Sequence, residues 1–153
     1  MNKTNRFFDY ANAAEFFEAV RHAVNENKEI ADRLDYLKNK SALPQEKVSK
    51  TRTDINGTAP TMDAIDYERI MQPVIERNEQ LAKNATAVIE AIASGLGSKY
   101  ADVVIARVLV ALKWSGVAST GSVGKTTAYR YYHVACDWCD SLGVHGLFSR
   151  EEL

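Results

Sequence analysis

The run Ser-Thr-Gly-Ser-Val-Gly-Lys-Thr-Thr at residues 119–127 places glycine, lysine and threonine at a spacing that suggests phosphate binding. The phosphate-binding loop of nucleotide hydrolases needs a glycine, four further residues, and then Gly-Lys-Ser or Gly-Lys-Thr. Ser119 stands where the first glycine belongs, and Gly121 comes two residues too late. The preceding residues 103–114 also show helical spacing instead of the buried strand that such a loop follows. The sequence therefore argues against a nucleotide site.

His133, Cys136 and Cys139 are spaced by three residues, which raises the hypotheses of a metal site and of a redox pair. A structural zinc ion normally takes four ligands, and His145 would complete the set only if the tail folded back. In a helix Cys139 belongs to the apolar face, where a free cysteine behaves as a small hydrophobic residue. No grouping of nucleophile, base and acid stands out elsewhere. We therefore expect no metal, no cofactor and no enzymatic activity.

The composition is that of an ordinary globular chain of one domain, or of a small domain with a helical arm. Apolar residues make up 46% of the 153 residues, charged residues make up 25%, and the formal net charge is −1. No apolar segment approaches the roughly 20 residues that span a bilayer, and the N-terminal region lacks the apolar core of a signal peptide. We expect a cytoplasmic protein without contact to a membrane.

Two long segments, residues 13–38 and 63–98, repeat apolar residues at alternating intervals of four and three. This spacing is typical of a coiled-coil seam. Asn27 and Asn78 each occupy an a position, where a buried amide fixes the register of the helices. The alternative is that each amide is solvated at a loosely packed seam. Pro73 predicts either a kink or the true start of the second helix. The predicted oligomerisation seam consists of Val20, Asn27, Leu34, Met71, Asn78 and Ala85; pairing within one chain and pairing between chains both remain open.

The predicted fold is all-α, with long seam-forming helices followed by a C-terminal helix-turn-helix. Five segments are predicted: an N-terminal helix (1–38), a basic Ser/Thr/Pro linker (39–62), the second seam helix (63–98), the helix-turn-helix module (99–142) and a tail (143–153). Within residues 99–142, helical spacing connects Val103, Ala106, Val110 and Trp114.

Residues 111–139 can be divided into two helices and a short turn. Ala111–Ala118 predicts a short helix, Ser119–Val123 a turn, and Lys125–Cys139 a second helix. A helix-turn-helix inserts its second helix into the major groove, where arginine and lysine pair with guanine and threonine meets the thymine methyl group. The packed face of the second helix is predicted to consist of Ala128, Tyr132, Ala135 and Cys139. The side chains left for a partner are Lys125, Thr126, Tyr129, Arg130 and His133.

The run LKWSGVASTGSVGKTTAYRYYHVACDW, residues 112–138, resembles the helix-turn-helix of sigma factor region four. The layout of the chain resembles that of phage transcriptional regulators of the ArpU/RinA type, which activate late or packaging genes. The resemblance implies a recognition helix in which Lys125, Thr126, Tyr129 and Arg130 face DNA, with Thr127 and Tyr131 nearer its backbone. Packing inside the protein is an equal alternative for Tyr131. The turn departs from the family pattern, because Gly121-Ser122 replaces a hydrophobic residue followed by glycine, and Gly124 replaces a Ser or Thr cap.

The resemblance implies double-stranded DNA as the partner, in the nucleoid of a bacterial host cell. We expect a homodimer that binds two half-sites, and a contact with host RNA polymerase stays open. Residues 99–140 carry five basic side chains against three aspartates, a weak positive field that favours a second copy or a helper protein. Two alternatives remain. One is a DNA-packaging subunit of the small-terminase type, and the other is a coiled-coil interaction module whose helix-turn-helix is vestigial.

Overall fold

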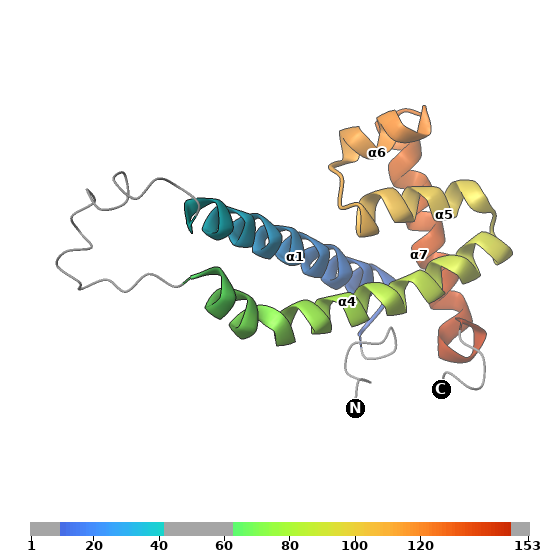
Figure 1. The fold of residues 1–153 in the computed structure, drawn as a ribbon. Helices are drawn as coiled ribbons and strands as arrows, with labels where there is room; N and C mark the ends of the chain where they lie inside the picture. Colours follow the sequence, from blue (N-terminus) through green and yellow to red (C-terminus); the bar gives the residue numbers. More distant parts are fainter. Residues whose placement is uncertain (1–9, 42–62, 148–153) are drawn as a thin grey trace. The chain divides into compact units, whose positions relative to one another are not determined.

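The computed structural model describes residues 10–41 and 63–147, with the backbone alone described at Ser41 and at residues 143–147. Over these ranges the fold is all-α, without strands (Figure 1). The elements are α1 (Ala13–Ser41), α4 (Ala64–Gly95), α5 (Ser98–Val104), the π-helical turn η3 (Ile105–Leu109), α6 (Trp114–Gly121) and α7 (Lys125–Leu147). None of these helices has the length and hydropathy needed to cross a membrane. The predicted all-α class is confirmed.

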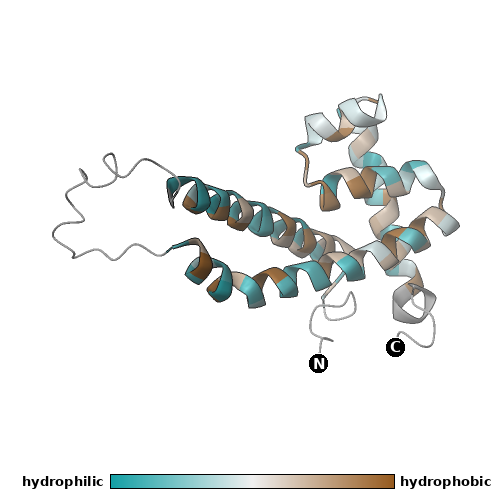
Figure 2. Cartoon of the chain, in the orientation of Figure 1, coloured by the Kyte–Doolittle hydropathy of each residue, from teal (hydrophilic) through white to brown (hydrophobic). Residues whose placement is uncertain are grey.

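The chain forms two compact units, residues 27–76 and residues 1–26 with 77–153. The smaller unit holds the second half of α1 and the first half of α4, along which Figure 2 shows hydrophilic residues interrupted by hydrophobic ones. Ile30 and Leu37 are buried, with 4% and 6% of their surface exposed. The amide of Asn27 donates to the carbonyl oxygen of Ile75 at 3.3 Å. The four-and-three spacing therefore marks the faces on which these two helix segments pack.

Pro73 lies inside α4, which begins at Ala64 and runs without interruption to Gly95. The alternative that Pro73 starts the helix is therefore wrong. Leu34 and Met71, two residues of the predicted seam, are half-buried in this unit.

The larger unit has a core to which all of its helices contribute. From α1 it takes Ala13, Phe16, Phe17 and Val20, each fully buried, and from α4 it takes Leu81, Ala85 and Val88 among others. Asn78 is also buried, at 4% exposure, and its amide donates to the Glu26 carboxylate at 2.9 Å. A buried amide without a partner would cost stability, so this bond favours one register of α1 on α4. Val20, Asn78 and Ala85 are thus buried within one chain, and their predicted role between chains stays a prediction.

The stretch from Val103 to Trp114 differs from the single helical run that its spacing predicts. Val103 and Ala106 are buried as expected, but the helix ends at Leu109 in a π-helical turn and Val110 is 44% exposed. Ala111 adopts the left-handed conformation, with φ at 63°, and the Leu112 N–H donates to the Ala106 carbonyl at 3.0 Å. The predicted helix over Ala111–Ala118 therefore begins three residues too early.

Arg107 holds this connection in place. Its Nη1 donates to the Leu112 carbonyl oxygen at 3.0 Å, and its guanidinium carbon lies 4.6 Å from the centre of the Trp114 ring. The hydrogen bond gives a donor to the Leu112 carbonyl, which lies between the helices and has no helical partner. The stacking on Trp114 holds the first residue of α6 in place. Arg107 thus sets the start of the helix that precedes the turn.

The ends of two predicted segments lie elsewhere than expected. Helix α1 continues to Ser41, into the predicted linker, whose remaining residues 42–62 are outside the described part of the chain. Helix α7 extends to Leu147, so the predicted tail begins inside a helix.

Gly95, the last residue of α4, lies against α7. A Cβ on Gly95 would overlap the Trp138 indole ring. Glycine at this position therefore allows α7 to pack closely against the end of α4.

Candidate nucleic-acid interface

The turn between α6 and α7 closes through two backbone hydrogen bonds. The Ser122 N–H donates to the Ser119 carbonyl at 3.2 Å, and the Val123 N–H donates to the Ala118 carbonyl at 3.0 Å. Ser122 is left-handed, with φ at 56°. This is the Schellman arrangement, which usually has glycine at the left-handed position. The departure of the sequence from the family pattern at Gly121-Ser122 therefore does not prevent a tight turn.

Val123 and Gly124 connect this turn to α7. Val123 is half-buried and packs against the core, so it anchors the turn. The Gly124 carbonyl accepts a hydrogen bond from the Ala128 N–H at 3.0 Å, so the helix starts at Lys125 as predicted. Gly124 brings no side chain to the end of the helix, and the N–H groups of the first turn stay available to an anion.

The predicted packed face of α7 is confirmed. Tyr132 is 7% exposed and meets the Trp114 ring edge-on, with 5.3 Å between the ring centres. The remaining members of the face are fully buried: Ala128, Ala135 and Cys139. Trp114 begins α6, so this contact orients α7 on the helix that precedes the turn.

The side chains predicted to face a partner lie outside the core. Tyr129 is 49% exposed, and its ring centre lies 4.3 Å from that of His133. Neither Lys125 nor Arg130 takes part in an ion pair within the described ranges 10–41 and 63–147. The exposed predicted residues are Lys125, Thr126, Tyr129, Arg130 and His133, and Thr127 is half-buried beside them. The geometry thus presents two unpaired cations, a hydroxyl and two aromatic rings at the start of one helix.

Tyr131 points to a different side of α7. Its ring centre lies 5.0 Å from that of Tyr100, and the Lys99 ammonium is 5.2 Å above the ring. The side chain is half-buried against the core. Of the two alternatives for Tyr131, packing is the one that its contacts favour.

Cys136 and Cys139 are both in the core, whereas His133 is exposed. Burial raises the pKa of each thiol to about 12. A metal ligand and a nucleophile both require the thiolate, which a raised pKa disfavours. No cluster of three or more His, Cys, Asp or Glu side chains suited to a metal occurs in the described ranges.

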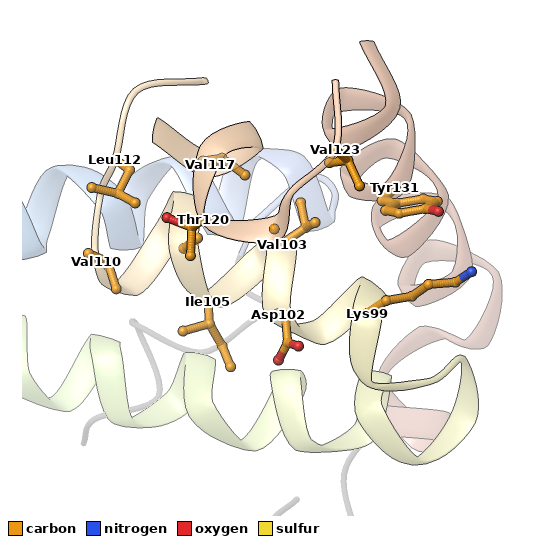
Figure 3. A pocket seen from close by; sticks show the side chains of 12 residues that line it. Lys99, Asp102, Val103, Ile105, Val110, Leu112, Val117, Thr120, Val123 and Tyr131 are labelled. Carbon is orange, nitrogen blue, oxygen red and sulfur yellow. The ribbon is translucent and has the colours of Figure 1, made fainter. Parts of the chain in front are cut away.

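The structure also contains a groove that the apolar spacing did not predict. It encloses about 540 Å³ between α5, η3 and the end of α6 (Figure 3). Its walls are mostly apolar side chains, with Thr120 among them, and Lys99 and Asp102 of α5 also line it. The only signal in the sequence is indirect. Ile105 and Val110 are large apolar residues in a segment whose apolar side chains cannot all face one core.

Comparison with protein-family models, with curated proteins and with solved structures found no match to this chain.

Proposed function

We propose that this protein is a sequence-specific DNA-binding regulator of phage or prophage transcription, similar to the ArpU/RinA type. In this proposal α6 and α7 form a helix-turn-helix, and α7 enters the major groove from Lys125 onward. The observation that carries it is the division of α7 into a buried face and an exposed polar face at its first turns. That division is what a recognition helix requires.

The exposed side chains suit the chemistry of base edges. Arg130 and Lys125 can donate to guanine, and Thr126 can contact the thymine methyl group. Their position in the first two turns of α7 corresponds to the part of a recognition helix that reaches the bases. The free N–H groups beside Gly124 and the positive end of the helix dipole attract a phosphate. Together these groups supply both a contact that reads sequence and a contact that positions the helix.

The module's own charge is low, so we propose that it acts as a homodimer on two half-sites. Doubling the number of phosphate contacts strengthens binding without a more basic surface, since the second half-site binds at a high effective concentration. Contact with RNA polymerase bound nearby would raise the occupancy of the DNA site in the same way, by adding a second attachment. No catalytic step is assigned to the chain.

The experiment that tests this function is a selection of bound fragments from a genomic DNA library, followed by measurement of affinity against salt. We expect one enriched motif, and a slope of log affinity against log salt of about −0.9 for each phosphate contact. Spacing between half-sites in the motif would report the geometry of the dimer. Absence of any enriched motif would contradict the proposal and favour a protein-interaction role. Enrichment by rings of many subunits would favour a packaging role instead.

A further inference from the structure

Tyr129 is an aromatic side chain that the fold holds in place without burying it. Its ring is 49% exposed and meets the Trp114 ring edge-on, with 5.1 Å between the ring centres. The His133 ring, one helical turn further along α7, also meets it edge-on, at 4.3 Å. Edge-to-face pairs of aromatic rings attract each other, so both contacts restrict the rotation of the tyrosine side chain. Tyr129 is therefore a fixed apolar surface that remains open to a partner.

Trp114, which supports Tyr129, is itself held by two further contacts. Its ring centre lies 5.3 Å from that of the buried Tyr132, and the Arg107 guanidinium carbon lies 4.6 Å from its own centre. A series of contacts thus runs from the core through Trp114 to the exposed tyrosine. A side chain that is fixed before binding loses less conformational entropy when it meets a partner. The arrangement therefore favours binding through the ring of Tyr129.

The neighbours of Tyr129 on α7 indicate what kind of group its ring suits. Lys125, Tyr129 and His133 follow one another at intervals of four residues, so they form one row along the helix. Arg130, the residue after Tyr129, is also exposed. In the major groove, cationic side chains pair with the polar edges of guanine, whereas the one methyl group that a base presents there is the C5-methyl group of thymine. An exposed apolar ring among cations fits that methyl group.

We propose that Tyr129 determines sequence specificity by contacting the C5-methyl group of a thymine in the major groove. This contact rests on the proposed function, since α7 must first bind DNA. It is separate from the methyl contact that Thr126 can make, because the two side chains point about 60° apart around the helix. Burial of one methyl group against an apolar surface is worth about fourfold in affinity. A base without that methyl group would lose this contribution.

Replacement of single thymines by uracil in the selected DNA motif tests the contact, because uracil pairs as thymine does and lacks only the methyl group. Fluorescence anisotropy measures the affinity of the full-length protein for each substituted site. We expect one thymine of a half-site at which uracil weakens wild-type binding about fourfold. Tyr129→Phe keeps the ring and should keep this preference. Tyr129→Ser removes the ring and should bind thymine and uracil equally well at that position.

The ratio of the affinities for thymine and uracil separates a specificity role from a structural one. Both affinities are measured on the same protein, so a general loss of stability or of DNA binding cancels from their ratio. If Tyr129 only packed on Trp114, the serine variant would bind both DNAs less well and keep the wild-type ratio. Thr126→Ser should keep the ratio at the thymine that Tyr129 contacts. Tyr36→Ser, at an exposed tyrosine of α1, is the matched control and should keep it at every thymine.

Three results would overturn the role of Tyr129. The first is a selected motif that contains no thymine, or in which uracil replaces every thymine without loss of affinity. The second is a ratio that Tyr129→Ser leaves unchanged, and the third is a ratio that Tyr129→Phe abolishes. In all three cases the wild type still selects a motif, so the proposed function would stand. If the wild type selects no motif, both proposals fail together.

Discussion

The two faces of α7 have opposite chemistry although they belong to one helix. The buried face carries small or aromatic side chains, with Ala135 and Cys139 fully enclosed and Tyr132 packed on Trp114. The exposed face carries Lys125 and Arg130, which form no ion pair within the described residues. Packing determines which residues the first face can hold, whereas nothing in the fold requires two cations on the second. The contrast is what we expect if, as proposed, the exposed face contacts DNA.

The reactivity of the thiols should show the largest difference between the faces. Because burial raises the pKa of Cys136 and Cys139 to about 12, the native thiols are almost fully protonated at pH 8.5. We expect alkylation of the folded protein to be roughly 1,000-fold slower than that of the unfolded chain. Mass spectrometry of iodoacetamide-treated protein, with and without denaturant, measures this difference. Equal rates in the two conditions would mean that this face is open to solvent.

The same two thiols should make stability fall at alkaline pH. The unfolded thiols ionise near pH 8.5, and the folded ones only near 12. Their contribution is therefore complete below pH 8.5 and is lost as pH rises through this window, by up to about 1.4 kcal/mol per pH unit for each thiol. Urea unfolding of the wild type and of the Cys136→Ala/Cys139→Ala variant, at pH 7 and pH 10, isolates the effect. The double variant should lose less stability between the two pH values.

Substitution with aspartate should distinguish the faces by their effect on folding. Ala135→Asp places a carboxylate in a fully buried position without a partner, and we expect it to lower the free energy of unfolding by about 3 kcal/mol or more. Val134→Asp is the matched control, because the neighbouring side chain is 37% exposed and can keep its charge in water. We expect the control to change stability by less than about 1 kcal/mol. Comparable losses in thermal or urea unfolding would refute the assignment of the buried face.

Removing a cation from the exposed face should affect binding and leave folding unchanged. Arg130→Ala should weaken binding to the selected DNA motif by about 10-fold to 100-fold, the usual value of one base contact. Arg69→Ala, at an exposed arginine of α4 that pairs with Asp66, is the control and should bind as the wild type does. Fluorescence anisotropy gives the affinities, and the melting temperature should not move. If both variants bound equally well, Arg130 would have no role in the interface.

The smallest expected effect concerns the turn that connects α6 to α7. Ser122 is left-handed, which costs a residue with a Cβ about 1 kcal/mol relative to glycine. Ser122→Gly should therefore raise the free energy of unfolding by roughly 0.5–1 kcal/mol without altering the turn. Gly121→Ala, inside α6 where a Cβ meets only Val123 at 3.8 Å, tests a helical position for comparison. A decrease in stability of the Ser122→Gly variant would show that the serine hydroxyl makes a contribution of its own.

The predictability of the structure also differs between regions. The buried faces of α7, α1 and α4 followed from periodicity, since apolar residues at helical spacing must face a core. The pairing of α1 with α4 in one chain did not follow from it. The stretch after Val104 could not be predicted in this way, because its apolar residues continue the same spacing through Trp114. Alanine is the best helix former, so the left-handed Ala111 carries no local signal. Its conformation is supported by Arg107, which contacts Leu112 and Trp114 only in the folded chain.

The exposed face of α7 could be predicted from the sequence, whereas the groove could not. The exposed set from Lys125 to His133 could be inferred from residue types on one helix. The groove could not, because Lys99, Val110 and Val123 come together only when α5, α6 and the turn pack. A groove formed by several short elements has no period in the sequence. Tyr131 illustrates the limit: its residue type suits either DNA or a core, and its contact with Tyr100 favours the core.

The central claim is that the exposed face of α7 reads base pairs, and a selection performed with two proteins tests it most directly. Wild type and Arg130→Ala would each be taken through selection from the same random double-stranded DNA library. We predict that the two motifs agree except at one or two adjacent base pairs, where the variant loses its preference. Identical motifs, or no motif from the wild type, would contradict the claim.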